Sequence, residues 1–279
     1  MNPVDGNQPG STPTWIDLDV PDLERAKEFY GALFGRTFDT TAATAESDGS
    51  TTCLLRGLAV AAFRPASAPG SAPGFWRMYS ATRDCDATAQ RVVDAGGALT
   101  QGPLDVGDRG RAALASDSVG ARFGLWQGRT HPGCRIVNEP GSLVRNDLST
   151  PGPGPARDFC TALLGFTLDG NPDLPGFDFT FLRRPDGHGT GGIFGDPTAT
   201  ASVWQTTFEV AGTDAVAERA VAAGGAAGAP EDFPYGRMAE ITDPFGTVFH
   251  VIARPPAQRG GTERDGRGRS GDSVSLRAQ

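Results

Sequence analysis

The chain has 279 residues and a formal net charge of −8, from 33 acidic and 25 basic side chains. This negative charge argues against a nucleic acid or an anionic membrane as the main partner, because both would repel it. Four cysteines far apart in the sequence exclude a zinc-ligand pattern and a compact disulfide framework, and no apolar run is as long as a membrane span. We therefore expect a cytoplasmic protein with reduced thiols.

The elements of the first half follow one another in a regular order. Residues 14–20 alternate apolar and polar side chains, which predicts a half-buried strand. Asp22 then begins a helix that ends at Gly35, a residue type that commonly terminates helices. Further strands are expected at 52–55, 58–63, 75–82, 111–115 and 121–127, and a second helix at 86–95.

The second half of the chain repeats the first. Residues 29–35 (FYGALFG) match 159–165 (FCTALLG), Asp86 matches Asp214, and Asp117 matches Asp243, always in the same order. The pattern predicts an α+β fold of four βαβββ modules, two in each of two domains. We place the domains at 12–130 and 143–254, an interdomain connector at 131–142, and disordered tails at 1–11 and 255–279, where apolar residues are few.

Two motifs carry a family resemblance. Residues 18–23 (LDVPDL) with Phe29 and Tyr30, and the turn at 243–247 (DPFGT) before a last strand, resemble the glyoxalase/bleomycin-resistance/dioxygenase (vicinal oxygen chelate) superfamily. The segment 124–139 is similar to the junction of a two-domain actinobacterial subgroup that includes a mycobacterial glyoxalase-like antigen. The resemblance implies that each domain is a curled mixed sheet forming a cup for a small molecule.

Metal-dependent members of this superfamily place His, Glu or Gln at fixed positions in the strands. The matching positions hold Trp15, Arg77 and Gly124 in the first domain, and Arg145, Gln205 and His250 in the second. Indole, guanidinium and glycine cannot ligate a metal. We therefore expect no cofactor in the first domain and none in the second, where a divalent metal on Gln205 and His250 is the alternative.

Three residues are candidates for acid–base chemistry. His250 has the cup-facing parity of the last strand, and a satisfied core histidine is the alternative. Asp17 and Asp147 occupy equivalent positions in the two first strands, where a carboxylate in an apolar cup could act as a general base. We favour salt bridges instead, from Asp17 to Arg77 and from Asp147 to Arg145 or Arg237. His131 in the connector and His188 in a turn are interpreted as structural and solvated, respectively.

The remaining cup-facing residues predict ligand contacts. Trp15, Tyr79 and Trp126 would form an aromatic wall in the first domain, with Arg77 beside it, although packing between the half-sheets is the alternative. The corresponding positions of the second domain are smaller and more polar. They comprise Arg145, Ser149, Gln205, Thr207 and Glu209.

Three hypotheses for function follow. The first is a metal-independent protein that binds a small aromatic or antibiotic-like molecule, as members that confer antibiotic resistance by sequestration do. The second is an enzyme, either a glyoxalase-type lyase or isomerase, or a metal-free tailoring enzyme of secondary metabolism that uses the Asp and His side chains. A scaffold for protein contacts is the third. Replacement of the ligand positions by Trp and Arg favours the binding protein; the ligand and homodimer formation stay open.

Overall fold

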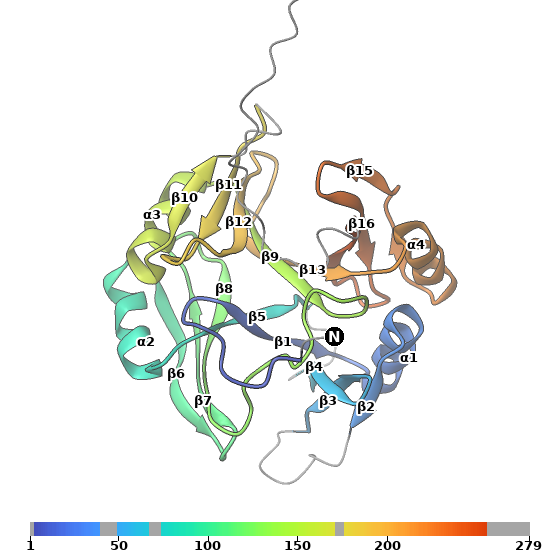
Figure 1. Ribbon diagram of the computed structural model, residues 1–279, viewed down its shortest axis with the longest axis horizontal. Helices are drawn as coiled ribbons and strands as arrows, with labels where there is room; N and C mark the ends of the chain where they lie inside the picture. The colour runs from blue at the N-terminus through green and yellow to red at the C-terminus, as the bar shows by residue number, and fades with distance from the viewer. Residues whose placement is uncertain (1–2, 40–48, 67–73, 171–175, 256–279) are drawn as a thin grey trace, which may run out of the picture.

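The computed structural model describes residues 3–39, 49–66, 74–170 and 176–255. Two curled sheets of the same plan lie side by side, with helices on their outer flanks (Figure 1). The first half comprises β1 (Pro13–Val20), α1 (Leu23–Phe34), β2 (Thr37–Asp39), β3 (Thr51–Leu55), β4 (Leu58–Pro65), β5 (Arg77–Ala81), α2 (Cys85–Asp94), β6 (Ala98–Val106), β7 (Gly110–Ser116) and β8 (Arg122–Gly128).

The second half repeats this order. It comprises β9 (Leu143–Thr150), α3 (Pro153–Leu164), β10 (Thr167–Gly170), β11 (Phe179–Arg183), β12 (Gly189–Gly195), β13 (Val203–Glu209), α4 (Thr213–Ala222), β14 (Ala226–Ala227), β15 (Glu231–Phe233), β16 (Gly236–Thr242) and β17 (Val248–Ala253). Among the described residues, no helix is long and apolar enough to cross a membrane.

Each sheet joins two βαβββ modules through its two central strands. The strand orders are β2-β3-β4-β1-β5-β8-β7-β6 and β10-β11-β12-β9-β13-β17-β16-β14, with β15 paired to β16. The central pairs β1/β5 and β9/β13 are antiparallel, whereas β1/β4 and β5/β8 are parallel. The mixed sheets and four modules confirm the predicted α+β fold.

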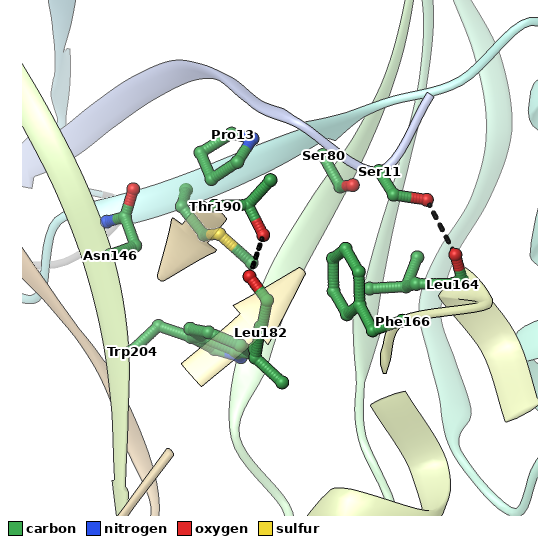
Figure 2. A pocket seen from close by; sticks show the side chains of 10 residues that line it. Ser11, Pro13, Ser80, Asn146, Leu164, Phe166, Leu182, Thr190 and Trp204 are labelled. Carbon is green, nitrogen blue, oxygen red and sulfur yellow. Dashed lines mark hydrogen bonds between the residues drawn. The ribbon is translucent and has the colours of Figure 1, made fainter. Parts of the chain in front are cut away.

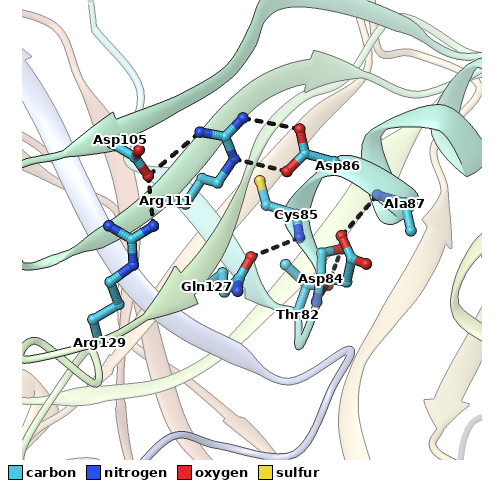
Figure 3. Close-up of polar contacts among 9 residues, drawn as sticks. All are labelled: Thr82, Asp84, Cys85, Asp86, Ala87, Asp105, Arg111, Gln127 and Arg129. Carbon is cyan, nitrogen blue, oxygen red and sulfur yellow. Dashed lines mark hydrogen bonds and ion pairs between the residues drawn. The ribbon is translucent and has the colours of Figure 1, made fainter.

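Local sequence sets the helix ends at the predicted places. The Asp22 side chain accepts the backbone N–H of Arg25, which caps the first turn of α1, and Gly35 ends the helix in the left-handed conformation. At the start of α2, the two carboxylate oxygens of Asp86 accept hydrogen bonds from Nε and Nη2 of Arg111 on β7 (Figure 3). Arg237 and Asp214 repeat that ion pair in the second half, so the duplication extends to surface charges.

The strands that the sequence analysis missed lie at the edges of the first sheet. β2 has three residues, and β6 is largely exposed and contains Gly102 and Pro103. An edge strand with little buried surface shows no alternation of apolar and polar side chains.

The expectation of a disordered N-terminal tail is wrong for its described part. The Val4 N–H donates to the Arg135 carbonyl, and the Arg135 guanidinium binds Asp5 at 2.9 Å, so the segment lies against the connector. These partners are far apart in sequence, so composition alone could not reveal them. Apart from Pro255, the predicted C-terminal tail lies outside the described residues.

The two halves share one hydrophobic core through reciprocal contacts. α1 lies beside α4, and α2 lies beside α3 (Figure 1). The Phe29 ring of α1 lies on Gly225, where a Cβ would come within 2.7 Å of it, and the Phe159 ring of α3 lies on Gly97 in the same way, at 2.9 Å. The residues that make the repeat visible in the sequence are therefore those that form the contact between the repeats.

We expect Gly97→Ala and Gly225→Ala each to lower the free energy of unfolding by about 1–3 kcal/mol, because the added methyl group overpacks a buried contact. The new Cβ would also lie 2.5 Å from a backbone carbonyl in both places, which cannot move aside easily. Gly102→Ala is the matched control, since nothing lies within 4 Å of its Cβ position. Chemical denaturation measures the difference, and equal midpoints for all three variants would contradict this packing.

The turns before β8 and β17 rest on buried aspartates. Asp117 accepts the backbone N–H groups of Val119 and Ala121 through Oδ1, and Asp243 accepts those of its own turn. The Tyr30 hydroxyl donates to Asp243 Oδ2 at 3.0 Å. No described group hydrogen-bonds Asp117 Oδ2, and burial raises the pKa of this carboxyl to about 6, against the lowering effect of its backbone hydrogen bonds.

This pKa makes stability fall as the pH rises from about 4 to about 6, because the folded protein then holds a proton that the unfolded chain has released. Asp117→Asn keeps the Oδ1 acceptor but does not titrate. From pH 4 to pH 7, the variant should gain about 2 kcal/mol in free energy of unfolding relative to the wild type. Urea titrations at several pH values test this, and parallel pH curves for the two proteins would refute it.

Candidate functional site

Each sheet has one face that packs on the helices and one face turned away from them. Side chains alternate between faces along a strand, and cross-strand partners share a face. We call the second faces cup one and cup two. Cup one contains Trp15, Asp17, Asp19, Arg64, Arg77, Tyr79 and Trp126. Cup two contains Arg145, Asp147, Phe179, Phe181, Phe194, Gln205, Thr207, Glu240 and His250.

An ion-pair network fills the centre of cup one. Arg77 binds Asp17 at 2.7 Å and Asp19 at 2.8 Å, and the Tyr79 hydroxyl donates to the other oxygen of Asp17 at 2.7 Å. Arg64 lies 3.8 Å from Asp17. Burial raises the pKa of Asp17, although Arg77 and Tyr79 oppose the rise. The predicted salt bridge is therefore present, and both Asp17 oxygens are engaged, which does not favour the general-base role considered for this residue.

The aromatic residues of cup one are packed rather than open. Trp15, Tyr79 and Trp126 are only 9%, 5% and 6% exposed. His131 of the connector contacts Trp15 edge-on at 4.5 Å, and its carbonyl accepts the indole N–H of Trp126 at 2.8 Å. Burial lowers the pKa of His131 to about 4, so this imidazole is neutral. The residues of the expected ligand wall therefore form a packed cluster, the alternative given for them, and His131 of the connector packs against it.

The aromatic wall lies in cup two instead. The Phe177 ring stacks on Phe194 at 4.7 Å and lies nearly parallel to Phe179 at 6.2 Å, while Phe181 contacts Phe179 edge-on. Phe177 is 42% exposed, and Phe179 and Phe194 are half-buried, so the wall faces solvent. The alternation of phenylalanines at 177, 179 and 181 is the sequence signal for this face, and it was not among the predicted site residues.

One ion pair borders this wall. Arg145 binds Asp147 Oδ1 through two nitrogens at 2.6 and 2.9 Å, as one of the predicted alternatives required. The guanidinium also lies over the rings of Phe179 and Phe181, at 5.4 and 5.8 Å from their centres. Arg237, the other predicted partner of Asp147, lies on the helix side of the sheet with Asp214.

The opposite half of cup two is polar. In the strand register, Thr207 of β13 lies next to His250 of β17, and Glu240 of β16 lies on the far side of His250. Burial lowers the pKa of His250, while Glu240 and Asp147 oppose that effect. Within the described part of the chain, the side chains of Gln205 and His250 have no hydrogen-bond partner, although both are half-buried.

Two further predictions concern the margins of the site. Glu209, expected to contact a ligand, is fully buried and binds Arg254, so that prediction is wrong. Glu209 lies on the cup side of β13, as its position in the alternation predicts, but Arg254, which directly follows β17, covers it. His188 lies in the turn between β11 and β12, as predicted, where its backbone N–H donates to Asp186.

The residues at the superfamily's metal positions do not fit a divalent cation. In cup one, Gly124 is covered by the Tyr79 ring, and Arg77 takes the nearby carboxylates. In cup two, Arg145 places a positive charge beside Gln205 and His250. Among the described residues, no three His, Cys, Asp or Glu side chains lie close enough together to hold a metal ion.

Between the two sheets, the described residues line a cavity that is too small for a small-molecule ligand. This cavity is about 10 Å³, room for about one water molecule, and is lined by residues such as Ser80, Asn146 and Trp204 (Figure 2). A ligand of drug size needs several hundred Å³. Cup two is therefore the best candidate site of the described chain.

Arg77→Met should lower the free energy of unfolding by about 3–5 kcal/mol, because it leaves the buried Asp17 carboxylate with only the more distant Arg64 as a cation. Adding Asp17→Asn to that variant should restore part of the loss. Arg111→Met, which removes an equally well-formed but exposed ion pair, is the matched control and should change the denaturation midpoint little. An Arg77 variant as stable as this control would show that the network does not stabilise cup one.

Comparisons with known proteins agree with this architecture. A family model described as the Glyoxalase/Bleomycin resistance protein/Dioxygenase superfamily matches residues 12–125. The protein CFP32 of Mycobacterium tuberculosis, named provisionally as a glyoxylase, is 37% identical over 252 residues, which cover 88% of this chain and 96% of that protein. The anthracycline biosynthesis protein DnrV of Streptomyces peucetius is 34% identical over 262 residues, covering 88% and 93%.

Solved structures share the fold at low sequence identity. The Mn(II)-bound glyoxalase from Novosphingobium aromaticivorans superposes with a TM-score of 0.62 at 17% identity, over 88% of this chain and 82% of that chain. The halotolerant catechol dioxygenase BphC gives a TM-score of 0.63 at 14% identity, over 92% and 89%. From the family match and the relatives along most of its length, this chain belongs to the glyoxalase/bleomycin-resistance/dioxygenase superfamily.

Proposed function

We propose that this chain is a small-molecule-binding protein that holds a planar aromatic compound in cup two without a metal ion. The contrast between the cups carries this proposal. The polar groups of cup one bind one another, whereas Gln205 and His250 in cup two lack hydrogen-bond partners among the described side chains and border a partly exposed aromatic wall. Half-buried polar groups of this kind are stabilised when a ligand supplies their hydrogen bonds.

The wall favours a flat ligand. Phe177, Phe179 and Phe194 present nearly parallel or offset rings, on which a planar ring system gains contact area at small entropic cost. Opposite them, Gln205, Thr207 and His250 can exchange hydrogen bonds with hydroxyl or carbonyl groups at the ligand's edge. The relative named for anthracycline biosynthesis supports an aromatic polyketide as the class of compound.

The donor set supports metal independence. Arg145 stays protonated and is bound to Asp147, so a divalent cation next to it would meet a like charge. Elemental analysis of the purified protein provides a check, with His250→Ala in parallel. About one equivalent of a transition metal that is lost in the variant would overturn the metal-free proposal.

Binding can be tested with daunorubicin, a planar anthracycline that reports its own binding by fluorescence. We expect one molecule per chain, insensitivity to EDTA, and an increase in Kd of about tenfold or more in Phe179→Ala and Phe194→Ala, because each loses about 1.4 kcal/mol of ring contact. Trp15→Phe in cup one is the matched control and should leave Kd unchanged. Loss of binding in that control alone would place the ligand in cup one and contradict the proposal.

A further inference from the structure

We propose that cup two also catalyses a cofactor-free keto–enol isomerisation, in which His250 moves a proton within a bound aromatic 1,3-dicarbonyl compound. This inference rests on the proposed binding function, because the compound must first lie against the phenylalanine wall. It goes beyond binding in assigning the site an activity.

The position of His250 provides the base. Its ring lies on the cup face, flanked by Thr207 on β13 and Glu240 on β16, and hydrogen-bonds no side chain of the described residues. The ring therefore keeps an unprotonated nitrogen for a ligand, unlike His131, which is packed between indoles. A histidine that is neutral near pH 7 and in reach of a ligand is suited to general-base catalysis.

The charges around His250 support the second half of the reaction. Asp147 on β9 and Glu240 on β16 are the acidic groups that act on the imidazole, and both stabilise its protonated form. Two nitrogens of Arg145 donate to Oδ1 of Asp147, and this double contact holds the carboxylate in place. Asp147 is thus a positioning residue that favours the imidazolium formed during the reaction.

The step needs no other reactant. An unprotonated nitrogen of His250 takes the proton from the carbon between the two carbonyl groups, and the C–H electron pair forms a C=C bond as one carbonyl becomes an enolate oxygen. The Gln205 amide and the Thr207 hydroxyl, on the strand next to His250, can donate hydrogen bonds to that oxygen. The imidazolium then returns the proton to the oxygen, so the product is the enol with every atom conserved.

The test uses the enol of 2-naphthoylacetone, diluted from an aprotic solvent into water, where its conversion to the ketone is followed by absorbance. The wild type should accelerate this reverse reaction about 100-fold over an equal concentration of imidazole, within the usual range for a positioned acid–base group. His250→Gln should reduce the rate to that of the buffer without protein or imidazole, with the same circular dichroism spectrum. His188→Gln, the matched control in the β11–β12 turn, should keep the full rate.

The pH profile distinguishes catalysis from a structural role of the same residues. The rate should fall on the acid side as His250 becomes protonated, below the usual pKa of histidine because burial lowers the value. Asp147→Asn removes a charge that raises this pKa, so its acid limb should move to lower pH. If the acid side of the pH–rate profile stays unchanged in Asp147→Asn, Asp147 is not a positioning residue for His250.

Binding of the same probe, measured by quenching of protein fluorescence, separates the two proposals. If the probe binds in a manner that depends on Phe179 but the wild type gives no acceleration, or His250→Gln is fully active, the isomerase inference is wrong and the binding function stands. If neither this probe nor daunorubicin binds, both proposals are overturned.

Discussion

A buried guanidinium lies at the junction of the two halves of the molecule. Arg36 is 4% exposed and lies between the rings of Phe34 and Phe208, 4.5 and 4.7 Å from their centres. Two of its nitrogens donate to the carbonyl of Gly141 in the connector, at 2.9 and 3.2 Å. Burial lowers its pKa, and the aromatic faces and the carbonyl stabilise the cation in part, since its Nη1 has no hydrogen-bond partner among the described residues. The contact fixes the end of α1, the connector and β13 relative to one another. Because β13 carries Gln205 and Thr207, this junction in the first half also sets the polar side of cup two.

The duplicated sheets show how one scaffold can support a closed and an open cup. In cup one, Arg77 lies where Gln205 lies in cup two, next to the aspartate of the neighbouring strand. The arginine binds Asp17 and crosses to Asp19, so the polar groups satisfy one another and the tryptophans pack above them. The glutamine side chain is shorter than that of arginine and carries no charge, so Gln205 cannot form the corresponding pair of ion pairs. The Gln205 side chain has no such ion pair and is half-buried, which is why cup two is the candidate site.

The sequence predicted most of the fold, because the repeat and the strand alternation report burial directly. Both ends of α1 followed from local patterns, the four modules from the repeat, and the Asp17–Arg77 salt bridge from the cup-facing positions of two strands. The aromatic wall did not, although phenylalanines alternate from 177 to 181. The partner strand β12 is rich in glycine, and Gly192 has no side chain to mark the cup face; its role is to let the Phe179 ring lie directly upon it, where a Cβ would come within 2.2 Å. The burial of Glu209 was equally invisible, since Arg254 covers it from 45 positions away.

The Arg145–Asp147 ion pair of cup two also bears on the proposed role of His250 as a base. A histidine that ligates a metal gives its lone pair to the ion and cannot accept a proton. Arg145 occupies the position from which a second ligand would come, and its charge repels a cation. Left alone, that charge would also disfavour the imidazolium. Asp147 binds this guanidinium through a two-nitrogen contact and raises the pKa of His250, so it favours the imidazolium despite the nearby arginine. In the proposed activity, the Arg145 guanidinium therefore disfavours a metal ion in cup two, and its aspartate partner favours the imidazolium that returns the proton.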